Sequence, residues 1–258
     1  MDKVKKDRAR PVRRRSAPAV RAAPSPPRTL SEEAYSRLEE MIVTLELAPG
    51  DLISEAGLCA TLGIGRTPIR EALQRLQAEH LVRILPKRGA MIEQIHIEQH
   101  LLALEVRRAL ERIVAARAAH LCTDDKRERF ESLAEQMEAV AAAGDDRAFL
   151  ELDREFHALL TATARNQFAT AALAPLQALS RRYWYMHQRR HQDMVRSATL
   201  HAAVMRAVAA GDSEGAIAAI DGLLAYAHAV TRDAVTVDFH QTYEPSRQSP
   251  SGSSAPAE

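Results

Sequence analysis

The tightest constraint on the fold is a short turn, Gly63-Ile64-Gly65, between two helical patterns. Before the turn, Leu58 and Leu62 are four residues apart, so they share one face of a short helix that Ser54 can cap. After the turn, Thr67-Pro68 opens another helix, because proline costs little at an early helical position. The inner face of this second helix carries Ile69, Leu73 and Leu76. Two helices joined by so tight a turn predict a helix-turn-helix unit.

The segments on either side of this unit complete a small domain. Ser31 is a good N-cap for a preceding helix, with two glutamates in its first turn. Beyond the unit, residues 81–84 and 90–92 are short β-prone stretches, joined by the basic turn Pro86-Lys87-Arg88-Gly89. The order helix, helix, turn, helix, hairpin is that of a winged helix-turn-helix, which we expect over residues 31–93.

From Ile97 onward the pattern is helical throughout. We expect helices near 97–121, 124–143, 146–164, 167–190, 194–210 and 213–234. Aromatic residues make up 4% of the chain and hydrophobic residues 46%, which favours helices packed through aliphatic side chains. Short connections predict an antiparallel helical bundle over residues 94–236. The expected fold class is therefore mainly α: an N-terminal winged helix-turn-helix plus a C-terminal all-α antiparallel helical bundle.

Charge is distributed unevenly, although the formal net charge is only +1. Residues 1–30 hold ten Lys and Arg against two Asp, and such a segment cannot bury enough apolar area to offset its ordering entropy. We interpret residues 1–30 as a disordered basic tail and residues 237–258 as a second disordered tail. Residues 66–88 hold six basic against two acidic side chains, so positive charge also gathers around the helix-turn-helix and hairpin.

The cysteines and the apolar runs indicate a cellular compartment. Cys59 and Cys122 are the only cysteines and both lie in apolar helical patterns, so we expect no disulfide or thiolate metal site, which fits a reducing compartment. No apolar run approaches the roughly 20 residues of a membrane span. The basic N-terminus also lacks the apolar stretch of a secretory signal. We therefore expect a cytoplasmic protein with no membrane partner.

Candidate DNA-binding residues lie at the start of the helix after the turn. Arg66 and Arg70 are four residues apart, so they share a face that points away from Ile69. An arginine can grip phosphate or donate two hydrogen bonds to guanine. Thr67 offers a hydroxyl to a phosphate beside the N–H groups of the helix start. We expect this end of the helix to enter the major groove of double-stranded DNA.

The hairpin tip adds Lys87 and Arg88, and Gly89 allows the backbone to approach a partner closely. Charge alone fits a helical hairpin with solvated arginines equally well. The turn, the Thr-Pro helix start and the basic wing together favour DNA binding.

This region resembles the recognition region of the GntR family of bacterial regulators. The resemblance lies in residues 62–76, Leu-Gly-Ile-Gly-Arg-Thr-Pro-Ile-Arg-Glu-Ala-Leu-Gln-Arg-Leu, with the preceding loop at 47–55 and the wing at 87–90. It implies a homodimer that binds a short palindromic operator. Carried over by position, it implies DNA contacts at Arg66, Thr67, Arg70, Arg88 and Gly89. At Gly65 this chain departs from the many relatives that have Ser or Thr, so a side-chain contact to phosphate is lost there.

A second candidate site lies in the helical half. Asp153 and His157 are four residues apart on one helix, at the edge of its core face, and His201 lies on a later helix. One carboxylate with imidazoles is a suitable ligand set for Zn²⁺, Ni²⁺ or Mn²⁺. The spacing alone favours a His–Asp hydrogen bond without metal, since acid–His pairs four residues apart are common on helices.

Residues 97–234 resemble the all-helical effector-binding domain of the FadR-type branch of the same family. Many members of that branch hold a divalent metal with one Asp and three His, and Asp153, His157 and His201 fall on three of those positions. Leu223 stands at the fourth and cannot be a ligand. His228 is five residues further on and points away from it. The resemblance also implies that Arg107 faces the cavity and pairs with an effector carboxylate, while a salt bridge with Glu111 is the alternative.

These observations favour a ligand-responsive transcriptional regulator, most simply a repressor, that responds to a small organic acid. One alternative is a metal-dependent hydrolase that uses Asp153, His157 and His201. No further acid or base, oxyanion loop or phosphate cradle accompanies those residues, so we expect no enzyme. The other alternative is a helical protein-interaction module.

Overall fold

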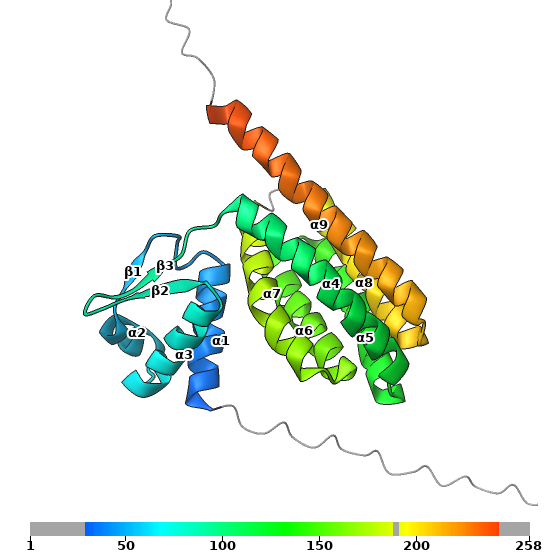
Figure 1. Cartoon of the computed structure of the whole chain (residues 1–258), viewed down its shortest axis with the longest axis horizontal. Helices are drawn as coiled ribbons and strands as arrows, with labels where there is room; N and C mark the ends of the chain where they lie inside the picture. Colours follow the sequence, from blue (N-terminus) through cyan, green and yellow to red (C-terminus); the bar gives the residue numbers. More distant parts are fainter. Residues whose placement is uncertain (1–28, 188–190, 243–258) are drawn as a thin grey trace, which may run out of the picture.

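The computed structural model describes residues 29–187 and 191–242. A small α/β part, α1 to β3, lies beside a larger group of helices, α4 to α9 (Figure 1). Each part has its own hydrophobic core, and α7 packs against α1 where the two parts meet. Within the described residues, no helix combines the length and the apolar character that crossing a bilayer requires. The fold class agrees with the expectation.

The first helix, α1 (Leu30–Val43), begins at a different cap from the one expected. Thr29, and not Ser31, is the N-cap: its hydroxyl accepts from the Glu32 backbone N–H at 3.2 Å, and the Glu32 carboxylate accepts from the Thr29 N–H at 2.8 Å. This reciprocal pair is a capping box. Ser31 instead lies in the first turn and donates to Glu71 of α3. Because Thr29 caps the helix, the Ser31 hydroxyl is available for this hydrogen bond, which connects α1 to α3.

The helix-turn-helix consists of α2 (Glu55–Leu62) and α3 (Arg66–Ala78). Ser54 caps α2 through the Gly57 N–H at 3.0 Å, as expected. Gly63 ends α2 with a φ of 69°, a left-handed conformation that glycine adopts without strain. Ile69, Leu73 and Leu76 of α3 are buried against α1. The turn therefore holds α3 with one face in the core and the other outward.

Three strands form the wing: β1 (Leu52–Ile53), β2 (Val82–Leu85) and β3 (Gly89–Ile92), in the order β1-β3-β2 and all antiparallel. The hairpin was expected, but β1 was not. A Cβ on Gly89 would lie 2.1 Å from the backbone oxygen of Ile53, and its φ is 98°. Glycine is thus required at 89 for β1 to pair with β3.

Six helices form the bundle: α4 (Ile97–Leu121), α5 (Asp124–Ala143), α6 (Asp146–Ala164), α7 (Gln167–His187), α8 (His191–Ala210) and α9 (Ser213–Thr242). The bounds of α4, α5 and α6 equal the expected ones. The start of α8 lies three residues before the expected 194, and the C-terminal end of α9 extends past the other helices (Figure 1). Residues 237–242 are therefore helical, which corrects the tail expected there. Residues 1–28, 188–190 and 243–258 lie outside the described residues.

Candidate functional site

The exposed start of α3 carries three predicted DNA-binding residues. Arg66, Thr67 and Arg70 are exposed, while Ile69 between them is fully buried. The Arg70 Nε donates to the Glu55 carboxylate of α2 at 2.8 Å. The Arg70 side chain is 60% exposed, so this ion pair is weak and can be exchanged for a phosphate or a base.

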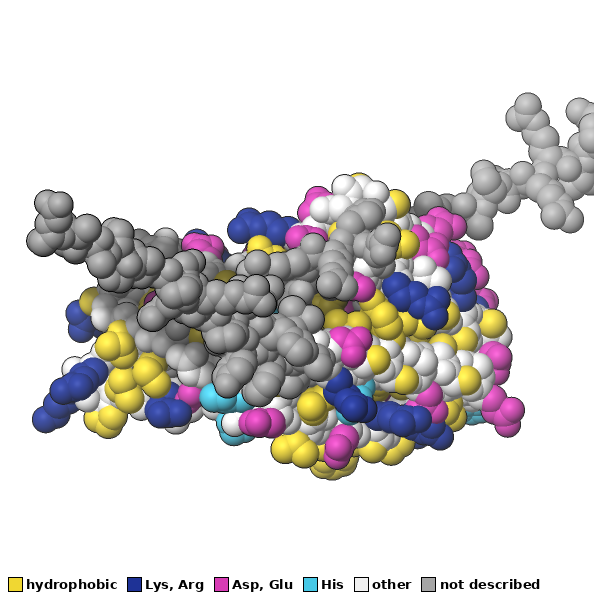
Figure 2. Space-filling model, turned by 90° about the horizontal axis from the view of Figure 1, so that it is seen from above, with side chains coloured by type: hydrophobic (Ala, Val, Ile, Leu, Met, Phe, Trp, Pro, Cys, Tyr) yellow, Lys and Arg dark blue, Asp and Glu magenta, His cyan; other side chains and the backbone are white. Residues whose placement is uncertain are grey.

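The tip of the β2–β3 hairpin carries the other predicted contacts. Lys87 and Arg88 are exposed, and the Arg88 N–H donates to the Leu85 oxygen at 3.0 Å, which closes the turn. Figure 2 shows dark blue Lys and Arg side chains at the end of the molecule that carries this hairpin in Figure 1. Gly89 is half-buried against β1, so glycine is required at this position by packing within the protein, whether or not the residue contacts DNA.

Gly65 is the N-cap of α3, and it provides no side-chain hydrogen bond. Its φ of −67° and ψ of 164° are ordinary for a capping serine or threonine. A Cβ at this position would meet nothing within 4 Å. The backbone therefore accepts a hydroxyl-bearing cap that this chain does not have.

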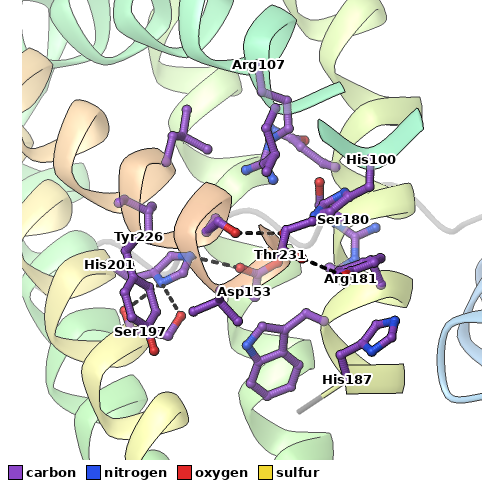
Figure 3. Close-up of a pocket in the computed structure, with 18 of the residues that line it drawn as sticks. His100, Arg107, Asp153, Ser180, Arg181, His187, Ser197, His201, Tyr226 and Thr231 are labelled. Atoms are coloured by element: carbon purple, nitrogen blue, oxygen red, sulfur yellow. Dashed lines mark hydrogen bonds and ion pairs between the residues drawn. The ribbon is translucent and has the colours of Figure 1, made fainter. Parts of the chain in front are cut away.

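The second site is a cavity of about 80 Å³ in the helical bundle. It is lined by residues of α4, α6, α7, α8 and α9, and it has aromatic and aliphatic walls with polar groups at both ends (Figure 3). Phe149 of α6 stacks on Trp184 of α7 at 4.8 Å between ring centroids. The volume is several times the roughly 10–15 Å³ that one water molecule needs. A compact molecule of a few carbon atoms therefore fits.

The predicted metal-ligating residues come together beside one end of the cavity, which Asp153 and His201 line and His157 does not. One ligand atom from each of Asp153, His157 and His201 lies within 4.8 Å of the other two. The Asp153 Oδ1 is 3.0 Å from the His201 Nε2 and 3.7 Å from the His157 Nε2. All three side chains are buried. Burial alone would raise the pKa of Asp153, but His157 and His201 outweigh it and hold that pKa well below its usual range.

The environment of His201 fits a bound cation. Its Nδ1 lies 2.8 Å from the backbone oxygen of Ser197, which can only accept, so the proton sits on Nδ1. The Nε2 lone pair then faces the Asp153 carboxylate, an arrangement that needs a second proton or a metal ion between the two. Two atoms about 3 Å apart can both bind one ion at about 2.1 Å. The donor set therefore suits a divalent metal with three protein ligands.

His157 is held by groups that compete with a metal. Burial lowers its pKa to about 4, so the ring is neutral near pH 7. Its Nδ1 is 3.1 Å from the Gln177 side-chain nitrogen, and its Nε2 is 3.4 Å from the Arg107 Nη2. Arg107 also donates to the fully buried Glu111 at 2.8 Å, the alternative considered from the sequence. Arg107 thus lines the cavity and forms the salt bridge at once.

Leu223 lies where the resemblance places the fourth ligand. It is buried, lines the cavity and has no donor atom, while His228 is not among the lining residues. His228 therefore does not replace the missing ligand.

Sequence reasoning placed Arg181 near the cavity, which it lines, but it missed other polar residues there, among them His100 and Ser180. His100 lies on α4 and stacks on Tyr183 of α7 at 4.1 Å between ring centroids. Burial, with Arg107 and His187 nearby, lowers the pKa of His100 to about 3. No local motif marks these positions, because they meet only through the packing of α4 on α7.

Two neighbouring arginines of α7 connect the cavity to the DNA-binding half. Arg181 lines the cavity and donates to Glu39 of α1. Arg182 is fully buried and donates to the backbone oxygen of Glu93, just after β3, at 2.7 Å. Through these two arginines, the α7 wall of the cavity directly contacts the first helix of the winged domain and the residue that follows its last strand.

Comparisons with known proteins agree with this geometry. Residues 30–92 match the model for bacterial regulatory proteins of the gntR family, and residues 102–226 match the FCD domain. The HTH-type transcriptional repressor RspR of Escherichia coli K12 is 32% identical over 162 residues, which cover 63% of this chain and 71% of that protein. The HTH-type transcriptional regulator YdfH of Escherichia coli O6:H1 is also 32% identical, over 163 residues and the same shares of the two chains.

Among solved structures, the E. coli protein McbR/YncC is similar in fold, with a TM-score of 0.67 at 18% identity. The match covers 83% of this chain and 99% of that one. The gntR match covers the domain with the exposed α3, and the FCD match covers most of the helical bundle that contains the cavity. The chain therefore belongs to the GntR family of DNA-binding transcriptional regulators, in the group that carries an FCD domain, and it is a regulator and not an enzyme.

Proposed function

We propose that the protein is a repressor that a small organic acid releases from a palindromic operator. The observation that carries this proposal is the position of Arg181, which lines the cavity and pairs with Glu39 of the DNA-binding half. The related RspR is a transcriptional repressor, which supports repression as the sign of the regulation. An effector can change DNA affinity only if it binds one relative arrangement of the two domains more tightly than another. A contact between the cavity wall and α1 provides the structural connection that this coupling requires.

The proposed DNA surface consists of Arg66, Thr67 and Arg70 on α3 with Lys87, Arg88 and Gly89 on the wing. All of these residues except the half-buried Gly89 are exposed, which supports this assignment. In this proposal Arg70 leaves Glu55 for a base edge, and Thr67 and the wing cations contact phosphates.

The proposed effector is a compact carboxylate. Its carboxylate binds at the Asp153 end of the cavity, where the Arg107 guanidinium and a divalent ion held by Asp153, His157 and His201 supply positive charge. The candidate ions are Zn²⁺, Ni²⁺ and Mn²⁺. The metal would add a Lewis-acidic anchor, and with three protein ligands it keeps open positions for a ligand oxygen.

We also propose a homodimer, because a palindromic operator offers two half-sites. Leu102, Val106 and Ile113 share one face of α4 and are exposed, which supports a protein contact there. Sedimentation of the full chain tests this: Leu102→Glu should shift it toward monomer and weaken operator binding, and an unchanged dimer would exclude this face.

Fluorescence anisotropy with DNA from upstream of the gene tests the proposed function. The expected result is a sequence-specific complex that weakens as salt is raised and dissociates on adding at least one short organic acid, with the response stronger in Zn²⁺. Asp153→Asn should keep the DNA complex and lose the response to acid. A complex that no acid and no metal alters would refute the proposal.

A further inference from the structure

We infer that His100 and Ser180 form a polar subsite that recognises a hydroxyl group of the effector, so that the ligand class is a compact hydroxy acid. This inference rests on the proposed function, because it presumes that the cavity takes an organic acid. It adds a second anchor at the end of the cavity away from His201.

Both side chains are buried and have an atom that lacks a partner. His100 is 3% and Ser180 8% exposed, and both line the cavity. Among the described residues, the His100 Nδ1 and the Ser180 Oγ have no hydrogen-bond partner. Buried polar atoms without partners are rare because they cost free energy. A ligand group that hydrogen-bonds to both atoms would remove that cost.

Local structure fixes the two groups on the same wall. Ser180 lies one turn before Tyr183 on α7, and the His100 ring stacks on Tyr183 with an interplanar angle of 17°. Figure 3 shows His100 and Ser180 across the cavity from His201, with Asp153 between the two sides. A ligand that reaches from Asp153 toward α7 therefore meets both groups, and the stacking holds the imidazole in place.

The chemistry of this wall matches an uncharged polar group. A neutral imidazole and a hydroxyl each donate and accept one hydrogen bond, as a ligand hydroxyl does. The two arginines that line the cavity already have carboxylate partners, Arg107 with Glu111 and Arg181 with Glu39. A ligand hydroxyl satisfies both orphaned atoms without competing for either of these two ion pairs.

Titration calorimetry with the full chain tests the subsite on three pairs of acids that differ by one hydroxyl: lactate and propionate, 4-hydroxybutyrate and butyrate, malate and succinate. We expect the protein to bind the hydroxylated member of at least one pair about tenfold more tightly, the worth of one well-placed hydrogen bond. Ser180→Ala and His100→Phe, which keeps a ring on Tyr183, should each lower that ratio below about threefold, because each removes one of the two atoms that bind the hydroxyl.

Thr163→Val is the matched control, because it removes a buried hydroxyl of α6 outside the cavity and should keep the ratio. Binding without a hydroxyl preference, or a preference that survives both variants, overturns the subsite and leaves the proposed function standing. If none of the six acids binds, with or without Zn²⁺, both inferences fail. Ser180→Ala removes only one oxygen, so it decides the question even if the His100 variant does not fold.

Discussion

The ion pair between Arg181 and Glu39 predicts how strongly the two halves of the chain are coupled. The two side chains are 10% and 6% exposed. Removing one partner of a buried pair leaves the other charge without compensation, which typically costs about 3–5 kcal/mol. Because both groups keep slight access to water, we expect Arg181→Met and Glu39→Gln each to lower the free energy of unfolding by about 2–4 kcal/mol.

The double variant should recover most of that loss. With both charges gone, no unpaired charge is buried, and we expect its free energy of unfolding within about 1 kcal/mol of the original chain. The coupling energy of the cycle is then at least about 3 kcal/mol. The same double variant should bind the operator but respond less to the effector, because the cavity has lost its link to α1.

Urea denaturation followed by Trp184 fluorescence measures these changes. Trp184 is the only tryptophan in the chain, and it lies three residues after Arg181 on α7. All variants are compared at one protein concentration, since a dimer's stability depends on it. The exposed pair Arg206–Glu138 is the control and should couple by less than about 1 kcal/mol. Additive losses in the Arg181–Glu39 cycle would refute the buried-pair argument.

Four further predictions concern single residues. Arg70→Ala should cost about 1–3 kcal/mol of operator binding and relax base preference in anisotropy titrations; an unchanged preference would assign Arg70 to phosphate. Gly65→Ser should stabilise the chain by a few tenths of a kcal/mol and tighten operator binding relative to Gly65→Ala, and equal affinities would exclude a hydroxyl contact. Leu223→His should raise the affinity for Zn²⁺ by more than about tenfold in calorimetry, since even outer partners of a metal are worth that much; no change would mean that the three other residues do not hold the ion. In the unfolded chain His100 takes up a proton near pH 6.5, whereas in the folded chain it does so only near pH 3. The free energy of unfolding should therefore fall by up to about 1.4 kcal/mol per pH unit as the pH is lowered through that range. His100→Phe should make this fall shallower in acid denaturation.

The sequence predicts the helices that have clear local signals. The break at Gly144-Asp145 is visible because glycine adopts the left-handed end of α5 and Asp145 caps α6. The cap of α1 was misplaced because Ser31 and Thr29 are both good caps, although the spacing of Thr29 and Glu32 is that of a capping box. Strand β1 has only two residues, too few for any periodic pattern, and it can pair with β3 because Gly89 has no Cβ to clash with the Ile53 backbone oxygen.

The candidate sites divide in the same way. Asp153 and His157 share a helix face, so their spacing already brings them together. His100 and Ser180, in contrast, line the same cavity only because α4 packs on α7, and Arg181 reaches Glu39 across 142 positions of the chain. Such contacts follow from how the helices pack, which a single sequence does not encode in any local pattern.

The buried guanidinium of Arg182 has a consequence for how the protein changes shape. Within the described part of the chain, its Nε and Nη1 have no hydrogen-bond partner, and burial lowers its pKa to about 10. A methionine there would make the joint between the halves more stable, but also harder to open. The chain thus keeps a joint that is below its attainable stability, which suits the proposed regulation, because a compact effector supplies only a modest free energy to move it.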